Sequence, residues 1–271
     1  MPLSNADVTR QWYDLPKNWH SLYKWERTTG AAYLDLISAL IQASIADIHL
    51  DVNGLRKDNF HLPEEHKGLA EIQENITQFK EKRFCRAMFN HGRTESTLGN
   101  LEPFGEFLDY EVPLLAPGAG IQAAAHGRID LVSRSGDMLF LIEAKGITSD
   151  SVLKAILEAF TYSLLVAKRR VPFCKSFGVD EKIPITPAVL VLECTKASEQ
   201  LDQLHKGGQL DVLIKCLNQI LAKNEIGKMR FYVAEGDKAA IRESLEAETI
   251  NDKFVRIRFK QGCTPTIREI E

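Results

Sequence analysis

Residues 126–146, HGRIDLVSRSGDMLFLIEAKG, decide the fold of this chain. Two runs within this stretch, 128–134 and 138–145, are rich in β-branched and long apolar residues, which is typical of strands. Gly136 and Asp137 lie between them, and a glycine at the first central position favours a two-residue type II′ turn. The stretch therefore predicts a β-hairpin.

The turn fixes which residues face one another across the hairpin. If Ser135 pairs with Met138, Asp130 lies directly opposite Glu143. Side chains alternate along a strand, so Glu143 and Lys145 share one face while the residue between them points the other way. We therefore expect two carboxylates and one ammonium to converge on a patch about 5 Å across.

This grouping points to a cation site. Like charges directly opposite on paired strands repel, and a divalent cation held between Asp130 and Glu143 would remove that penalty. Mg²⁺ is bound by few carboxylates together with water and phosphate oxygens. Lys145 would lie beside the metal, where it can hold or help to deprotonate an attacking water. The alternative is an exposed amphipathic hairpin, because Glu-x-Lys by itself is common by chance.

Ile129-Asp130, followed about a dozen residues later by Glu143-Ala144-Lys145, resembles the signature of the PD-(D/E)XK nuclease superfamily. Ile129 stands where the family name has proline. The resemblance covers residues from about 105 to 233 and reaches no particular subfamily. It implies a restriction-endonuclease-like fold and an Mg²⁺-dependent deoxyribonuclease, expected to be an endonuclease, that hydrolyses phosphodiester bonds with a metal-activated water.

The same resemblance assigns roles to residues. Asp130, Glu143 and Lys145 are the expected catalytic residues. Asp130, Glu143 and the backbone carbonyl of Ala144 are the expected ligands of Mg²⁺ or Mn²⁺. Lys145 is expected to position and activate the nucleophile.

A helix is predicted after the hairpin, from about residue 151 to 170. Lys154, Glu158 and Tyr162 recur on it at four-residue spacing and form a polar stripe. This placement resembles the superfamily's helix motif, Lys…Gln-x-x-x-Tyr, which makes Glu158 and Tyr162 auxiliary site candidates. Glu158 replaces the usual Gln, and a carboxylate repels phosphate unless it joins the metal cluster. A Lys154–Glu158 helix pair is the alternative.

Many members of the superfamily also carry an acidic residue on a helix ahead of the hairpin. A long helix is predicted here from about residue 63 to 90. It offers Glu65, Glu71, Glu74 and Glu81 as candidates. Glu65 lies on the same face as the apolar stripe of this helix, and the other three are alternatives. The pattern gives no firm basis for a choice, and each is also explained as a solvated helix charge.

Residues 254–260 alternate between apolar and basic side chains. One face is expected to carry Val255, Ile257 and Phe259, and the other Arg256, Arg258 and Lys260. The basic strip is a candidate nucleic-acid contact if it lies on the active face. The alternative is an edge strand protected by its charge.

The composition, with 44% hydrophobic and 26% charged residues, is that of an ordinary globular protein. A formal net charge of −3 excludes a general polyanion-binding protein, so contact with DNA requires a local basic face. Five cysteines without metal-ligand spacing favour a reducing compartment. Residues 1–15 lack the apolar core of a signal peptide. The apolar segment 31–50 is predicted to be a buried helix rather than a membrane span, because it carries Asp35 and Asp47. We therefore expect a cytoplasmic protein without membrane contact.

Apolar runs and helical periods alternate in the rest of the chain. Strands are predicted near 105–115, 188–194 and 229–233, and helices near 209–223 and 237–248. We predict an α/β fold with a mixed central β-sheet flanked by helices. A helical N-terminal region at 1–62 would precede a nuclease-like domain at 63–271.

Two other functions remain open. The first is a non-catalytic nucleic-acid- or partner-binding subunit on the same fold, in a restriction, repair or defence complex, which should not bind Mn²⁺ at the hairpin. The second is a nucleotide-binding enzyme that uses the GxGxxA string Gly118–Ala123. That string leaves too little room for a crossover helix before the strand near His126. DNA is the expected partner, and a homodimer or a protein partner is compatible with the sequence.

Overall fold

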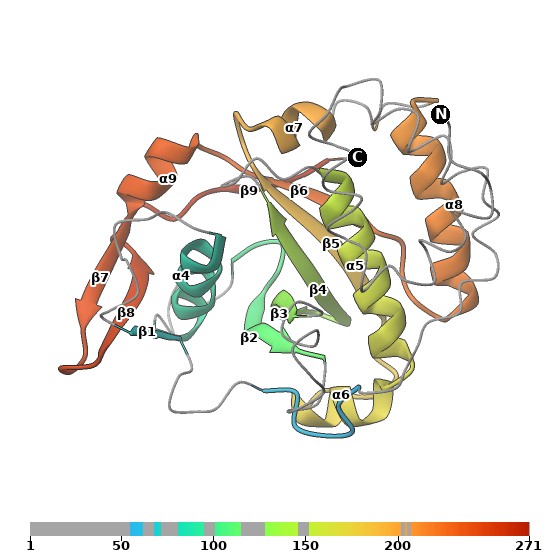
Figure 1. Cartoon of the computed structure of the whole chain (residues 1–271), viewed down its shortest axis with the longest axis horizontal. Helices are drawn as coiled ribbons and strands as arrows, with labels where there is room; N and C mark the ends of the chain where they lie inside the picture. Colours follow the sequence, from blue (N-terminus) through green and yellow to red (C-terminus); the bar gives the residue numbers. More distant parts are fainter. Residues whose placement is uncertain are drawn as a thin grey trace, which may run out of the picture.

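The computed structural model describes residues 55–61, 68–71, 81–94, 101–114, 128–145, 152–201, 204 and 207–270. Its centre is a mixed six-stranded sheet in the order β2-β3-β4-β5-β6-β9 (Figure 1). The strands are β2 (Glu106–Pro113), β3 (Arg128–Ser135), β4 (Met138–Lys145), β5 (Ile185–Leu192), β6 (Arg230–Ala234) and β9 (Ile267–Ile270). The predicted α/β class with a mixed central sheet is confirmed.

The sheet combines antiparallel and parallel pairing. β2, β3 and β4 are antiparallel neighbours, β4, β5 and β6 run parallel, and β9 returns antiparallel to β6. All eight residues of β5 are buried, as expected of a continuous apolar run between two parallel neighbours. The predicted strand, helix and strand, now β4, α5 (Val152–Ala167) and β5, form a βαβ unit with parallel strands.

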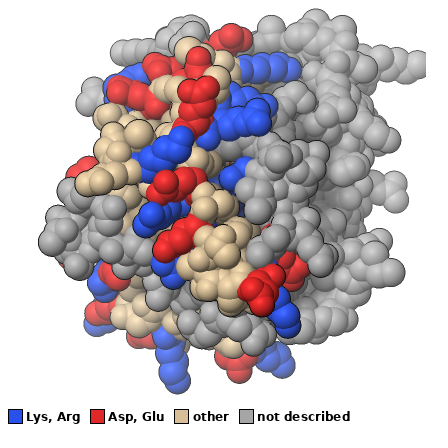
Figure 2. All heavy atoms as spheres, turned by 90° about the vertical axis from the view of Figure 1, so that its left-hand side faces the viewer, with Lys and Arg blue, Asp and Glu red and all other residues tan. Residues whose placement is uncertain are grey.

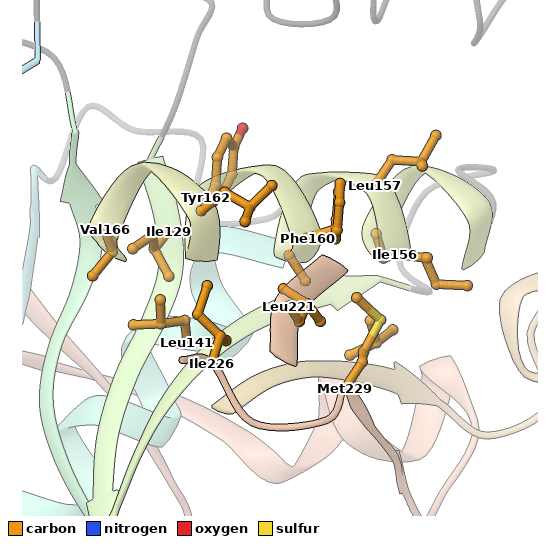
Figure 3. Close-up of a cluster of buried hydrophobic side chains, with 14 of the residues drawn as sticks. Ile129, Leu141, Ile156, Leu157, Phe160, Tyr162, Val166, Leu221, Ile226 and Met229 are labelled. Carbon is orange, nitrogen blue, oxygen red and sulfur yellow. The ribbon is translucent and has the colours of Figure 1, made fainter. Parts of the chain in front are cut away.

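Helices cover both faces of the sheet. On one face, α5 and α8 (Gln209–Lys223) bury their apolar sides against β4, β5 and β6 and form the α5-side core (Figure 3). On the other face, α4 (Glu81–Thr94) forms the α4-side core. Shorter helices are α6 (Arg170–Ser176), α7 (Lys196–Leu201) and α9 (Lys238–Ser244). Among the described helices, none is long and apolar enough to span a membrane.

A second, three-stranded sheet covers α4 from outside (Figure 1). Its order is β1-β8-β7, with β1 (Leu69–Glu71), β8 (Phe254–Phe259) and β7 (Leu245–Thr249). Its inner face carries Val255, Ile257 and Phe259, which are buried in the α4-side core as their alternation predicts. α4 is therefore packed between two sheets, and its first turn is held close to the end of β4.

Some predicted helix boundaries are wrong. The helix expected from residue 63 to 90 contains strand β1 in its described part, after Gly68 at φ 75°, and α4 begins at Glu81. The helix expected at 237–248 ends at Ser244, and Leu245–Thr249 pairs with β8 instead. Both strands are short. β7 pairs with β8, its neighbour in the chain, whereas β1 pairs with β8 from a distant part of the sequence, which local patterns do not reveal. β9 was not predicted for the same reason.

Part of the predicted N-terminal region packs on the central body. Phe60 lies edge-on to Phe173 of α6, with ring centroids 5.1 Å apart. His61 Nδ1 lies 2.6 Å from Oδ2 of the buried Asp109 in β2. The helix predicted at 31–50, the boundary between 62 and 63, and the Gly118–Ala123 string lie outside the described residues.

The buried Asn90 of α4 joins this helix to the second sheet. Its Nδ2 donates to the carbonyls of Gly68 and Ile257 at 2.8 and 2.7 Å. Asn90→Ala should lower the free energy of unfolding by about 2–4 kcal/mol, because two carbonyls lose their donor in a buried position. Chemical denaturation measures the change, with Asn251→Ala in an exposed turn as the control. Equal, small losses in both variants would contradict this role for Asn90.

Candidate functional site

The hairpin forms as the sequence predicts. Ser135 pairs with Met138, and the ladder continues to Leu131 and Ile142, which confirms the register. Gly136 has φ 54°, and Asp137 does not share this positive φ, as a type II′ turn requires.

Regular pairing between β3 and β4 ends at Leu131 and Ile142. At Asp130 and Glu143, hydrogen bonds from the backbone to side chains take the place of backbone–backbone hydrogen bonds. The backbone N–H of Asp130 donates to Glu143 Oε1 at 3.4 Å, and the N–H of Ala144 donates to Asp130 Oδ2 at 2.9 Å. The two carboxylates are thus adjacent, each bound to the backbone of the opposite strand. The methyl group of Ala144 points into the α4-side core, away from Glu143 and Lys145, as alternation predicts.

Four carboxylates from four elements face the ammonium of Lys145, the last residue of β4. Lys145 Nζ lies 3.2 Å from Glu158 Oε2 on α5 and 3.7 Å from Glu81 Oε2 on α4. It lies 3.8 Å from Asp130 Oδ2 on β3 and 3.9 Å from Glu143 Oε2 on its own strand. We call these five side chains the carboxylate–lysine cluster. The structure thus brings together Asp130, Glu143, Lys145 and Glu158, all of which were predicted.

Glu81 is the upstream acidic residue that the sequence left undecided. Glu71 lies in β1 and is exposed, and Glu65 and Glu74 lie outside the described residues. Glu81 precedes Cys85 and Met88, both buried in the α4-side core, by four and seven residues. This i, i+4, i+7 spacing placed Glu81 on the buried face of its helix and was the signal available in the sequence.

Burial dominates the electrostatics of the cluster. Glu143 and Lys145 are 2% and 6% exposed. Desolvation, followed by the charges of Asp130 and Glu158, raises the pKa of Glu143 well above its ordinary value. Desolvation lowers the pKa of Lys145, but the four surrounding carboxylates outweigh it and raise this pKa well above its ordinary value. Lys145 is therefore an ammonium in this arrangement.

Asp130 has an unusual protonation equilibrium. Desolvation raises its pKa from 3.8 to about 7, assisted by Glu81 and Glu111 and opposed by Lys145 and the Ala144 N–H. Tyr162, one turn beyond Glu158, is buried, and desolvation followed by the charges of Glu158 and Glu143 raises its pKa well above the ordinary value. Its hydroxyl points away from the apolar side chains of the α5-side core (Figure 3).

The donor set fits a hard divalent cation. Every acidic donor in the cluster is a carboxylate oxygen, the type that Mg²⁺ and Mn²⁺ prefer. Glu158 Oε2 is buried and makes no hydrogen bond, although it lies 3.2 Å from Lys145 Nζ. In the described part of the chain, no three His, Cys, Asp or Glu side chains are gathered so that they could hold a metal by themselves. Mg²⁺ does not require such a cage, because it keeps several waters and uses one or two carboxylates.

The basic strip on β8 lies elsewhere. Arg256 faces Glu248 at 3.6 Å, and Arg258 faces Glu246 and Glu248 at 2.7 and 3.8 Å. Figure 2 shows this side of the molecule, where basic and acidic side chains interleave. β8 is the central strand of its sheet, so the alternative of a charge-protected edge strand is wrong. Lys260 is exposed just beyond β8. The arginines point away from α4 and neutralise β7 glutamates, which weakens their assignment as phosphate contacts.

No family model, curated protein or solved structure matches this chain. Its function is therefore inferred from the carboxylate–lysine cluster itself.

Asp130 should make the metal-free protein less stable at higher pH. The folded state keeps the proton of Asp130 up to about pH 7, whereas the unfolded chain releases it near its ordinary pKa of 3.8. The stability linked to this proton is complete below about pH 4 and is lost as the pH rises through about 7. In EDTA, Asp130→Asn should therefore raise Tm relative to wild type by about 3 °C more at pH 8 than at pH 5.

Thermal unfolding monitored by circular dichroism measures this gap. Asp137→Asn, in the exposed turn of the same hairpin, is the control and should show no such pH dependence. A Tm difference for Asp130→Asn that stays constant between the two pH values would contradict the raised pKa.

Proposed function

We propose that this protein is a metal-dependent nuclease of the PD-(D/E)XK type that hydrolyses phosphodiester bonds in DNA. One observation carries the proposal: Asp130, Glu143 and Lys145 of the hairpin converge with Glu81 and Glu158 at the end of β4. A purely structural hairpin gains nothing from four carboxylates around one buried lysine, because their mutual repulsion and desolvation destabilise the fold.

The residues divide into metal-binding and substrate-facing groups. Asp130 and Glu143 would hold Mg²⁺ or Mn²⁺ together with the backbone carbonyl of Ala144, the last by resemblance to the superfamily. Glu81 and Glu158 add negative charge on either side. When bound, the metal supplies Lewis acidity and lowers the pKa of a coordinated water. The Ala144 N–H and the Asp130 N–H keep the two principal carboxylates in place through their hydrogen bonds.

Lys145 suits the role of an electrostatic stabiliser. In the hydrolysis, a water oxygen bonds to phosphorus and gives up a proton to solvent. The bond from phosphorus to the leaving oxygen breaks, that oxygen takes up a proton from solvent, and negative charge grows on the phosphoryl oxygens in the transition state. An ammonium at Nζ can donate hydrogen bonds to the attacking water or to those oxygens. It has no free lone pair with which to take a proton while the carboxylates face it. We therefore propose that Lys145 orients the nucleophile and stabilises charge rather than acting as general base.

A phosphodiester substrate follows from the charge of the site. Four carboxylates against one ammonium repel a phosphate unless a divalent cation offsets them, so the site suits an anion that arrives with a metal. DNA is preferred over a small phosphate ester by the resemblance to the nuclease superfamily.

Metal-dependent cleavage tests the proposal directly. Wild type should cleave supercoiled, linear or single-stranded DNA with Mg²⁺ or Mn²⁺ but not with EDTA. Lys145→Met should lower the rate by about 10²–10³-fold, because it removes the charge that stabilises the transition state. Gel analysis of the products identifies the preferred substrate, and an RNA substrate run in parallel tests the preference for DNA.

The control variant is Lys215→Met on α8, a lysine in an ion pair with Asp211 at 2.6 Å. It should cleave as wild type does. Cleavage that survives Lys145→Met would overturn the proposed site. Absence of both cleavage and Mn²⁺ binding would favour a binding subunit on the same fold.

Glu81 should contribute to cation binding. Glu81→Gln keeps the size of the side chain and removes one charge 3.7 Å from Lys145 Nζ, so Mn²⁺ affinity should fall about tenfold. Isothermal titration calorimetry measures this affinity without relying on catalysis. Glu71→Gln in β1 is the matched control. Equal Mn²⁺ affinities for the two variants would show that Glu81 does not contribute to the site.

A further inference from the structure

Glu111 of β2 has a backbone conformation that a strand residue rarely adopts. Its φ is 49°, in the left-handed region, although it lies between the paired residues Tyr110–Leu131 and Val112–Ile129, whose register is the same. Residues without glycine's freedom are held in this region only where the surroundings demand it, and such positions cluster at functional sites. Glu111 thus requires an explanation beyond strand formation.

Both strands change faces at this level of the sheet. Residues two apart in a strand normally share a face. Tyr110 and Leu131 lie in the α4-side core, but Val112 and Ile129 lie in the α5-side core. Figure 3 shows Ile129 beside Leu141 and Val166 on that side. The change of face occurs between these pairs, at Glu111 on β2 and Asp130 on β3.

This change of face explains how Asp130 reaches both sides of the sheet. Lys145 and Glu143 are on the α5 side, whereas Glu81 comes from α4 on the other side. The side chain of an aspartate in a regular strand would point to one face of the sheet only. Asp130 lies at the change of face. It is close enough to Glu81 for the two charges to interact, and it also contacts Lys145 and the N–H of Ala144.

The carboxylate of Glu111 connects the two elements that carry Glu81 and Asp130. Its Oε2 lies 3.2 Å from Arg128 Nη1 on β3 and 3.7 Å from Lys82 Nζ on α4. Arg128 is two residues before Asp130, and Lys82 directly follows Glu81. The Glu111 side chain is only 17% exposed.

We infer that Glu111 is a positioning residue, which holds Asp130 of β3 and Glu81 of α4 at a fixed separation through its twisted backbone and its bridge between Arg128 and Lys82. The inference rests on the proposed function, because it concerns the metal site of that proposal. Glu111 acts through these neighbours and touches no reacting atom.

The direction in which Mn²⁺ affinity changes when a basic side chain is removed separates a positioning role from a simple effect of charge. Arg128→Met and Lys82→Met each make the surroundings of the cluster more negative, which by charge alone should strengthen Mn²⁺ binding. If the bridge positions the carboxylates, each variant should instead weaken Mn²⁺ binding by about tenfold, as for other residues that orient metal ligands.

The experiment is Mn²⁺ titration of the full chain, followed by electron paramagnetic resonance of the free ion, with thermal unfolding in EDTA as a check of folding. Arg134→Met is the matched control, since Arg134 is also an exposed arginine of β3 paired to a glutamate of β2, Glu106 at 2.8 Å. It should change the affinity less than twofold. Arg128→Lys keeps the cation and should restore affinity to within about threefold of wild type.

The outcomes are distinct. Weaker binding by Arg128→Met and Lys82→Met, with rescue by Arg128→Lys, supports the inference. Binding as tight as wild type or tighter in both variants overturns it and leaves the metal site intact, even if their Tm falls. No Mn²⁺ binding by wild type overturns both the inference and the proposed metal site.

Discussion

The burial of one lysine among four carboxylates at the end of β4 is the constraint on which the arrangement of the site depends. Lys145 is 6% exposed, and its nearest charged atoms belong to α4, β3, β4 and α5. Removing charges from water is costly, and an unpaired ammonium there would not remain charged. The carboxylates compensate for that cost, but they exceed the lysine in number. The cluster therefore favours the uptake of further positive charge.

The layered architecture places these charges. The α5-side core fixes α5 on the sheet, so that Glu158 reaches β4, and the α4-side core fixes α4 between two sheets, so that Glu81 reaches the same point. The second sheet thereby supports the site without contributing a side chain to it. Its outer arginines, Arg256 and Arg258, bind glutamates of β7, which is typical of cross-strand pairs that stabilise a sheet.

The raised pKa values of the cluster and the left-handed backbone of Glu111 have the same effect on stability. Raised pKa values at Asp130 and Glu143, and a positive φ in β2, each reduce the stability of the fold where function would require it. If the proposed function is correct, the residues at such places serve the site, which is why local sequence rules fail there. Glu111 has no distinguishing pattern in the sequence, and only its backbone angle and ion pairs reveal it.

The sequence by itself determined the hairpin, its register and the shared face of Glu143 and Lys145, because turn chemistry and two-residue alternation are local properties. It also determined the buried parallel strand β5, the helices α5 and α8, and the buried face of β8. The tertiary structure decided that Glu81 rather than Glu71 joins the cluster, that Glu158 faces Lys145, and that β1, β7 and β9 are strands. Apart from β7, which pairs with the neighbouring β8, these outcomes depend on contacts between segments far apart in the chain. A local period can place a residue such as Glu81 on a buried face, but it does not specify which distant segment that face meets.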